Sequence, residues 1–199
     1  MNAKGTFICI EGLDGSGKTT QAKLLTESLK KDYDSYFTAE PSTGKTGTFI
    51  RDCCLYGRRR LPIAAEALLF SADRIEHIEN EIRPALSSGK VVVCDRYIYS
   101  SLAYQGSAGL ELDWIAKINS YALTPDFSVF IDVPPERVLE RIHRKKSVME
   151  TLEIQRKVRD VYLKYVQNNE LVLVDGDKPK EEVAEMLYSK ITGFLKARR

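Results

Sequence analysis

The feature that most constrains this chain is a glycine-rich loop close to its start. Residues 12–19 read Gly-Leu-Asp-Gly-Ser-Gly-Lys-Thr, which is a complete G-x-x-x-x-G-K-[ST] pattern. An apolar, β-prone stretch over residues 6–10 precedes the loop, and a run with good helix propensity begins at residue 18. Glycines let such a loop turn tightly, so that backbone N–H groups and the positive end of the new helix face an anion. In this context the pattern predicts a nucleoside triphosphate site.

The residues of this loop have separate predicted roles. Lys18 is expected to reach the terminal phosphates of the nucleotide, and the hydroxyl of Thr19 is expected to hold Mg²⁺. The other predicted ATP-binding residues are the rest of the loop and the start of the helix: Gly12, Leu13, Asp14, Gly15, Ser16, Gly17 and Thr20.

Length and composition indicate one soluble domain in the cytoplasm. The chain has 199 residues, of which 43% are hydrophobic and 29% charged, and its net charge of +2 predicts neither a nucleic acid nor a membrane partner. No segment approaches the roughly 18 apolar residues of a membrane span, and the start of the chain lacks an apolar signal core. The four cysteines are interpreted as reduced thiols, and the two histidines argue against a histidine-based metal site.

Strand-like and helical segments alternate along the chain. Short, nearly continuous apolar segments separated by helices predict a parallel sheet with helices on both faces. The expected strands cover residues 6–10, 35–39, 91–94, 127–133 and 171–174. One expected helix begins at residue 18. The other expected helices cover residues 64–82, 135–143, 150–167 and 180–196.

A second signal is an acidic residue at the end of an apolar strand. Four apolar residues over 91–94 are followed by Asp95 and Arg96. Ligands gather at the carboxyl ends of the strands in open α/β folds. Asp95 is therefore predicted to bind Mg²⁺, directly or through water, although many buried strands also end in Asp.

The helical pattern over residues 64–82 has two faces. Phe70 and Arg74 are i, i+4 neighbours on the polar face, together with Glu66 and His77. Phe70 is then either an incidental exposed ring or a platform on which a flat base stacks, with Arg74 reaching a phosphate or a base edge. The opposite face is an apolar stripe at helical spacing, of the kind that faces a core: Ala65, Leu68, Ala72, Ile75, Ile78 and Ile82.

Residues 97–106 supply many hydrogen-bonding groups directly after the acidic site. Ser101 and Gln105 are one helical turn apart and could read the edge of a base. The alternative is an ordinary polar helix surface.

Three of these segments together resemble the thymidylate kinase family. The loop reads E-G-L-D-G-S-G-K-T-T from residue 11, the helix carries L-F-S-A-D-R at residues 69–74, and residues 95–106 read D-R-Y-I-Y-S-S-L-A-Y-Q-G. The last segment matches the family's D-R-Y-x-x-S-S-x-A-Y-Q-G pattern and is specific, whereas the loop alone is not. The resemblance runs from about Phe7 to Val174.

The resemblance implies roles in recognising the base. Phe70 would stack on thymine, and Arg74 and Gln105 would contact its edge. Ser101 and Tyr104 would lie beside them in the substrate site.

The resemblance also implies how the sugar and phosphates are held. Asp14 would bind the 3′-hydroxyl of the deoxyribose, and Arg51 and Arg96 would grip the monophosphate. Arg141 would lie at the adenine of ATP, at the entry of a lid over about residues 141–149. The implied catalytic residues are Lys18, Asp95, Arg96 and Arg144.

The chain departs from the family pattern in three places. The common R-E-P-G-G-T turn is Ala-Glu-Pro-Ser-Thr-Gly at residues 39–44, so its arginine is missing. Tyr99 stands where Asp is frequent, and residues 147–148 are Ser-Val where the lid often has an acid and an arginine. Family members carry a catalytic arginine in the loop or in the lid, and the loop here has none. The positive charge is therefore expected from the lid, and the sequence leaves four candidates open: Arg141, Arg144, Lys145 and Lys146.

We expect an ATP-dependent kinase that converts dTMP to dTDP in dTTP synthesis, with Mg²⁺ as cofactor. The implied fold is a three-layer αβα P-loop fold with a five-stranded parallel sheet and a helical lid, in one domain over residues 1–199, and the implied assembly is a homodimer. Another nucleotide kinase of the same fold is the nearest rival. A nucleotide switch or an ATP-driven binding module is a rival from another class, but the N-K-x-D segment of GTPases is absent.

Overall fold

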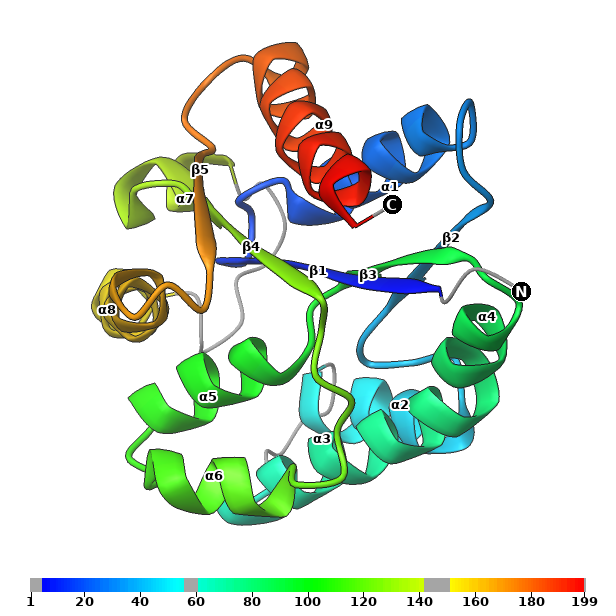
Figure 1. Cartoon of the computed structure of the whole chain (residues 1–199). Coiled ribbons are helices and arrows are strands. Elements are labelled where there is room, and N and C mark those ends of the chain that lie inside the picture. Colours follow the sequence, from blue (N-terminus) through cyan, green and yellow to red (C-terminus); the bar gives the residue numbers. More distant parts are fainter. Residues whose placement is uncertain (1–4, 56–60, 142–150, 199) are drawn as a thin grey trace.

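A five-stranded parallel sheet lies between two layers of helices (Figure 1). The computed structural model describes residues 5–55, 61–141 and 151–198. The strands follow the order β2-β3-β1-β4-β5 across the sheet. Their bounds are β1 (Thr6–Gly12), β2 (Ser35–Ala39), β3 (Val91–Asp95), β4 (Phe127–Asp132) and β5 (Val172–Asp175). The predicted sheet is therefore confirmed, with each strand at the expected place in the sequence.

The central strand β1 pairs with β3 on one side and with β4 on the other. Cys9 lies opposite Cys94 in the β1–β3 pair, and Ile10 lies opposite Val129 in the β1–β4 pair. Every residue of β1 and β3 is buried, because helices cover both faces of a parallel sheet. This register places the end of β1, where the glycine-rich loop begins, next to Asp95 at the end of β3.

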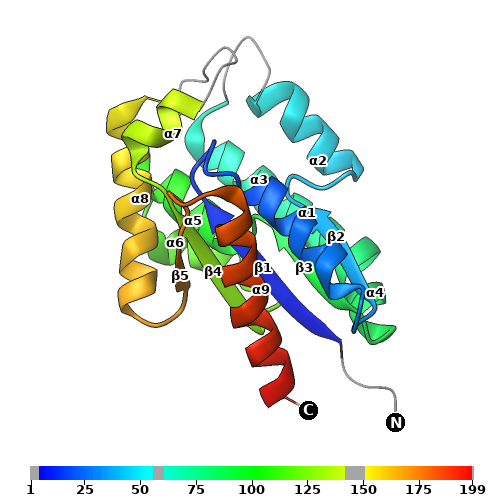
Figure 2. The ribbon, with the colours of Figure 1, turned by 90° about the horizontal axis from the view of Figure 1, so that it is seen from above.

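Two helices cover one face of the sheet. They are α1 (Lys18–Leu29), which follows the glycine-rich loop, and α9 (Lys180–Ala197), and they lie side by side (Figure 2). Val183, Leu187 and Ile191 of α9 are buried in the same core as Ala22 and Leu25 of α1.

The remaining helices pack on the opposite face and along the β5 edge (Figure 1). Helix α8 packs against α5 and α7. The bounds are α2 (Lys45–Ile50), α3 (Ile63–His77), α4 (Arg83–Ser87), α5 (Ile98–Ser107), α6 (Leu112–Ile118), α7 (Pro135–Arg141) and α8 (Leu152–Gln167). Two π-helical segments, η1 (Arg51–Leu55) and η2 (Ile78–Ile82), continue α2 and α3.

The prediction of which face of α3 meets the core was wrong. Leu68 and Ile75 of the apolar stripe are 51% and 41% exposed, whereas Glu66, Arg74 and His77 are buried. The polar face is buried because Arg74 and His77 have charged partners beneath the helix, which the periodicity of hydrophobic residues does not reveal. Only the end of the stripe, Ile78 and Ile82 in η2, reaches the core.

Other differences are at the ends of elements. The helix expected over residues 150–167 begins at Leu152, because the hydroxyl of Thr151 caps it by accepting from the N–H of Ile154 at 3.4 Å. The lid expected over residues 141–149 lies outside the described residues, except for Arg141. In the described part of the chain, no helix combines the length and apolar character needed to cross a membrane.

Candidate active site

The glycine-rich loop joins β1 to α1 at the carboxyl end of the sheet. Gly15 and Gly17 have φ values of 87° and 86°, which side chains with a Cβ rarely adopt, so the motif's glycines are needed for this turn. Lys18 is buried, and its ammonium donates to the carbonyl oxygen of Leu13 at 3.1 Å. Burial and the nearby Arg96 lower the pKa of Lys18, against the attraction of Asp14. The lysine charge is thus held at the mouth of the loop.

A pair of oxygen ligands lies at the end of β3 beside the loop. The hydroxyl of Thr19 donates to Oδ2 of Asp95, which joins the start of α1 to the end of β3. The other carboxylate oxygen, Oδ1, is buried and has no hydrogen-bond partner among the described residues. Carboxylate and hydroxyl oxygens are ligands that suit Mg²⁺, so both residues predicted for the metal fit that ion.

The backbone of Arg96 is strained where it turns out of β3. Its φ of 69° lies in the left-handed region, which is unfavourable for a residue with a long side chain. The carboxylate of Glu11 stabilises the turn by accepting from the N–H of Tyr97 at 2.9 Å and from the hydroxyl of Ser100 at 2.6 Å. Burial raises the pKa of Glu11, although these donors and Tyr162 oppose the change.

The turn directs the guanidinium of Arg96 at the loop. Its Nη2 lies 2.6 Å from Oδ1 of Asp14, and its Nη1 donates to the hydroxyl of Ser100 at 2.9 Å. The guanidinium also lies over the ring of Tyr104, 5.0 Å from the ring centre, and the hydroxyl of Tyr104 accepts from the N–H of Asp14 at 3.0 Å. These contacts fix a positive charge beside the loop, where a phosphate would lie.

A cavity of about 140 Å³ opens next to Arg96 and runs between α3 and α5. It brings together residues that are far apart in the sequence but were all predicted to bind the substrate. They are Asp14, Phe70, Arg74, Arg96, Ser101, Tyr104 and Gln105. Phe70 is half-buried in its wall, so the ring is not an incidental exposed aromatic residue.

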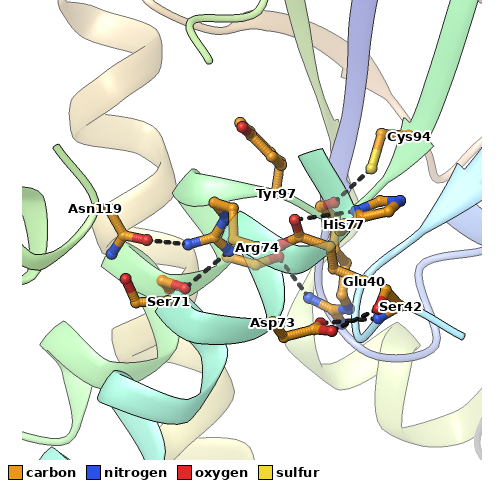
Figure 3. A network of polar contacts seen from close by, with 12 residues as sticks. Glu40, Ser42, Ser71, Asp73, Arg74, His77, Cys94, Tyr97 and Asn119 are labelled. Atoms are coloured by element: carbon orange, nitrogen blue, oxygen red, sulfur yellow. Dashed lines mark hydrogen bonds and ion pairs between the residues drawn. The ribbon is translucent and has the colours of Figure 1, made fainter. Parts of the chain in front are cut away.

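The charge of Arg74 lies at the wall of this cavity within a buried network (Figure 3). Nη2 lies 2.6 Å from Oε2 of Glu40 and 3.1 Å from the hydroxyl of Ser101, and Nη1 donates to Oδ1 of Asn119. The guanidinium also lies over the ring of Tyr97, 5.0 Å from its centre. Burial opposes the charge, but the Glu40 carboxylate outweighs it and raises the pKa of Arg74.

Three residues that line the cavity each carry a buried polar atom without a hydrogen-bond partner among the described residues. These atoms are Nε of Arg74, Oε1 of Gln105 and the hydroxyl oxygen of Tyr97. Buried polar groups rarely remain unpaired, so these atoms are suited to a ligand that completes their bonding.

A second cavity, of about 260 Å³, lies on the α9 side of the loop. Ser16, Gly17 and Thr20 of the loop and α1 line it together with Arg141 of α7 and Lys180 of α9. Arg141 is held there by the carbonyl of Gly176 at 3.3 Å and the carboxylate of Asp177 at 3.0 Å. Arg141 therefore lies beside the loop, in a cavity next to the predicted phosphate site.

Comparison with known families identifies the family of this chain. The chain matches the family described as thymidylate kinase over residues 10–187. The chain belongs to the thymidylate kinase family.

Individual relatives match nearly the whole chain. A probable thymidylate kinase from Pyrococcus abyssi is 45% identical over 197 residues, which cover 94% of this chain and 96% of the relative. One from Pyrococcus horikoshii is 48% identical over 172 residues, or 82% and 84% of the two chains. The thymidylate kinase of Halothermothrix orenii is 36% identical over 204 residues, or 96% and 99% of the two chains.

Arg51, which was expected from the thymidylate kinase pattern, does not join the other predicted substrate residues in the cavity. Arg51 is absent from the cavity lining, and its Nη1 instead donates to the carbonyl of Pro41 at 2.8 Å, which itself lines the cavity. Arg144 lies outside the described residues.

Sequence reasoning assigned no role to several residues that organise this thymidylate kinase site. Glu11 follows directly on the apolar residues of a strand. A carboxylate at such a position indicates a buried acid that stabilises its neighbours through hydrogen bonds. Glu40 stands in a turn that the family pattern shares, but nothing in the sequence indicates that it pairs with Arg74. Asn119 carries no recognisable sequence signal.

Proposed function

We propose that the chain transfers the γ-phosphoryl group of ATP to dTMP, giving dTDP and ADP, and so contributes to dTTP synthesis. One observation carries the proposal. A single cavity joins a half-buried ring and unpaired polar atoms, suited to a base, to Asp14 and Arg96 beside the phosphate loop.

The polar atoms of the cavity complement thymine. Thymine presents a carbonyl acceptor at O4 next to an N3–H donor. The unpaired Nε–H of Arg74 is a donor, and Oε1 of Gln105 is an acceptor. Cytosine presents an amino donor and an unprotonated N3 at the same edge, so it would leave Arg74 facing a donor. Phe70 supplies the face on which the base stacks.

The protein's part in the reaction is to align two phosphates and to neutralise their charge. The loop amides and Lys18 hold the phosphates of ATP, and Arg96 holds the monophosphate of the acceptor. Asp14 lies between Lys18 and Arg96, and in this proposal its carboxylate accepts a hydrogen bond from the 3′-hydroxyl of the sugar. Arg51 also grips the acceptor phosphate in the proposal, next to Pro41, whose carbonyl accepts from Nη1 of Arg51 at 2.8 Å.

Thr19 and Asp95 would hold Mg²⁺ at the end of β3. The unpaired Oδ1 of Asp95 supports this assignment. When bound, Mg²⁺ supplies charge neutralisation at the β- and γ-phosphates of ATP.

We propose one kinase domain over residues 1–199, with a lid over about residues 141–149 that closes over ATP. Arg144 is our choice for the catalytic charge of the lid, with Lys145 and Lys146 as weaker substitutes. The position of Arg141 at the entry to that segment, beside the loop, supports this proposal.

We further propose that the kinase is a homodimer that associates through the outer face of α3. Leu68, Ala72 and Ile75 form an exposed stripe there, at i, i+4 and i+7. Substituting Glu for both Leu68 and Ile75 should give monomers by light scattering. Leu24→Glu is a matched control, because Leu24 is an exposed leucine on α1, on the other face of the sheet. A dimer that survives the double substitution would contradict this interface.

We place the kinase in the cytoplasm. None of the four cysteines, all of which lie in the described residues, forms a disulfide, which supports a reducing compartment.

The proposed reaction can be tested by ³¹P NMR of the protein with ATP, Mg²⁺ and dTMP. We expect dTDP and ADP to appear in equal amounts, and a folded Lys18→Ala variant to form neither. Hydrolysis of ATP without formation of dTDP would contradict the proposal and favour a nucleotide switch or an ATP-driven module.

A further inference from the structure

His77 lies behind the base cavity, and no step of the proposed reaction uses it. It is the last residue of α3, and its side chain is 0% exposed. Figure 3 shows it on the far side of Glu40 from Arg74. The imidazole is thus separated from the cavity wall by one carboxylate.

Each ring nitrogen of His77 faces an oxygen atom. Nδ1 lies 3.3 Å from Oε1 of Glu40, the carboxylate that binds Arg74 through its other oxygen. Nε2 lies 2.6 Å from the hydroxyl oxygen of Thr38. The same nitrogen lies 3.6 Å from Oε2 of Glu81, one helical turn farther along the chain.

The hydroxyl of Thr38 has only one proton and lies near two groups that could accept it, Glu81 and Nε2 of His77. Thr38 Oγ1 donates to Oε2 of Glu81 at 2.8 Å. Burial disfavours the ionised form of Glu81, but donors from Thr38 and Thr43 and the nearby His77 outweigh it and lower the pKa of Glu81. With the Thr38 proton directed at Glu81, whose ionised carboxylate only accepts hydrogen bonds, the proton between Thr38 and His77 comes from Nε2.

The proton at the other ring nitrogen, Nδ1, can be assigned in the same way. Glu40 is paired with a buried guanidinium, and its carboxylate can only accept, so the proton between Glu40 and His77 must come from Nδ1. An imidazole that donates from both nitrogens carries a positive charge. The other titratable groups around the ring are Asp73, whose carboxylate accepts from Ser42, and Tyr36, whose hydroxyl donates to Glu81.

We propose that His77 is held as an imidazolium and positions Arg74 for recognition of the base, acting through the carboxylate of Glu40. The proposal rests on the assignment of the cavity to dTMP. Glu40 lies between two cations, and each of its oxygens is held by one of them. His77 fixes Oε1 of Glu40. The other carboxylate oxygen, Oε2, is therefore held in one orientation toward Nη2 of Arg74. His77 is therefore a positioning residue, and it does not touch the substrate.

Two substitutions separate the two contacts of the ring. The amide nitrogen of Asn occupies nearly the place of Nδ1, so His77→Asn keeps a donor toward Glu40 and loses the one toward Thr38. The amide nitrogen of Gln occupies nearly the place of Nε2, so His77→Gln keeps the donor toward Thr38 and loses the one toward Glu40. Both variants lose the ring, the charge and one hydrogen bond, so their losses of stability should be similar.

The two variants should differ in how they bind the acceptor. We expect His77→Gln to raise the KM for dTMP by about five- to tenfold, with kcat and the KM for ATP nearly unchanged, because the loss is in ground-state binding of the base. His77→Asn should stay within about twofold of the wild type. Equal KM values for dTMP in the two variants, or a larger rise in His77→Asn, would overturn the proposal, because a merely structural role does not distinguish them.

A second measurement needs no turnover, and it uses a variant only to assign the signals. The chain has only two histidines, His77 and His143, so ¹⁵N-histidine labelling gives two sets of ring signals in the wild-type protein. The set that disappears in His77→Asn belongs to His77. We expect both ring nitrogens of His77 to carry protons at pH 7, and an unprotonated ring nitrogen would overturn the proposal. This result does not depend on which monophosphate is the substrate, so it remains decisive if the assignment to dTMP fails.

Discussion

The guanidinium of Arg96 and the carboxylate of Asp14 meet at 2.6 Å, between Nη2 and Oδ1. Asp14 belongs to the phosphate loop, and Arg96 belongs to the turn that follows β3. The contact therefore joins the part of the site that we assign to ATP to the part that we assign to the acceptor. It also explains why a carboxylate is tolerated in a loop that binds anions, since Arg96 and Lys18 surround it with positive charge.

Asp14→Ala should raise the KM for dTMP, or lower kcat, by about ten- to a hundredfold, since a buried charged hydrogen bond contributes about 1.5–3 kcal/mol. Steady-state kinetics with dTMP and with an analogue that lacks the 3′-hydroxyl will test this. The analogue should be a poor substrate of the wild type and should be affected much less by the substitution. An equal loss for both acceptors would show that Asp14 shapes the loop and does not contact the sugar.

The Asp14–Arg96 pair should also contribute to stability in a pH-dependent way. Burial alone would raise the pKa of the Asp14 carboxyl, but Arg96 and Lys18 hold it well below its usual range. The contribution of such a group is complete above its unfolded pKa of about 3.9 and is lost as the pH falls toward the folded value.

We therefore expect urea unfolding to show a constant gap between wild type and Asp14→Asn from about pH 8 to pH 5, and a shrinking gap below about pH 4. The gap should be on the order of 1–3 kcal/mol in favour of the wild type at neutral pH. A gap that persists unchanged into acid would mean that the aspartate is not the ionised partner of Arg96.

Asp95→Asn should lower kcat by roughly a hundredfold, because it removes a charge near the transferred group. The variant keeps the shape of the side chain, and its amide oxygen can still accept from Thr19. Titration of activity with Mg²⁺ should show a higher requirement for the metal. Wild-type turnover at every Mg²⁺ concentration would show that Asp95 is only structural.

Phe70→Ala should weaken binding of dTMP by about 1–3 kcal/mol, the usual contribution of one stack between a base and an aromatic ring. Isothermal titration with dTMP and, separately, with ATP will measure both affinities. Phe70 lines only the base cavity of the two cavities described, so the affinity for ATP should hardly change. Similar losses for both nucleotides would indicate a folding defect.

Much of this fold could be predicted because its signals are local. The apolar strands, the glycine-rich loop and the acid at Asp95 each occupy a few consecutive residues, and the physics of a parallel sheet brings their ends together. The residues of the base cavity were found through a family pattern that also spans short segments. The residues alone left Phe70 either an incidental exposed ring or a stacking platform, and left Gln105 either a reader of a base edge or part of an ordinary helix surface.

The features that could not be predicted depend on contacts between residues that are far apart in the sequence. Arg74 is buried because Glu40, Ser101 and Asn119 surround it, and these partners are 27 to 45 positions away along the chain. Periodicity therefore assigned the wrong face of α3 to the core. The π-helical continuation of that helix from Ile78 has no sequence signal that we recognise.

The most direct test of the account is a competition among acceptors. The kinase is given limiting ATP with Mg²⁺ and an equimolar mixture of dTMP, dUMP, dCMP, dAMP and dGMP, and the diphosphates are separated and quantified. The product ratios then equal the ratios of kcat/KM, which measure discrimination directly. We predict that dTDP exceeds dCDP, dADP and dGDP by about a hundredfold or more. Cytosine and adenine mismatch the donors and acceptors of the cavity, and the two-ring guanine is larger than thymine, although its O6 and N1–H offer the same acceptor and donor. Since dUMP lacks only a methyl group, dTDP should exceed dUDP by about tenfold. A mixture in which dCDP or a purine diphosphate forms as fast as dTDP would contradict the assignment of this site to thymidylate.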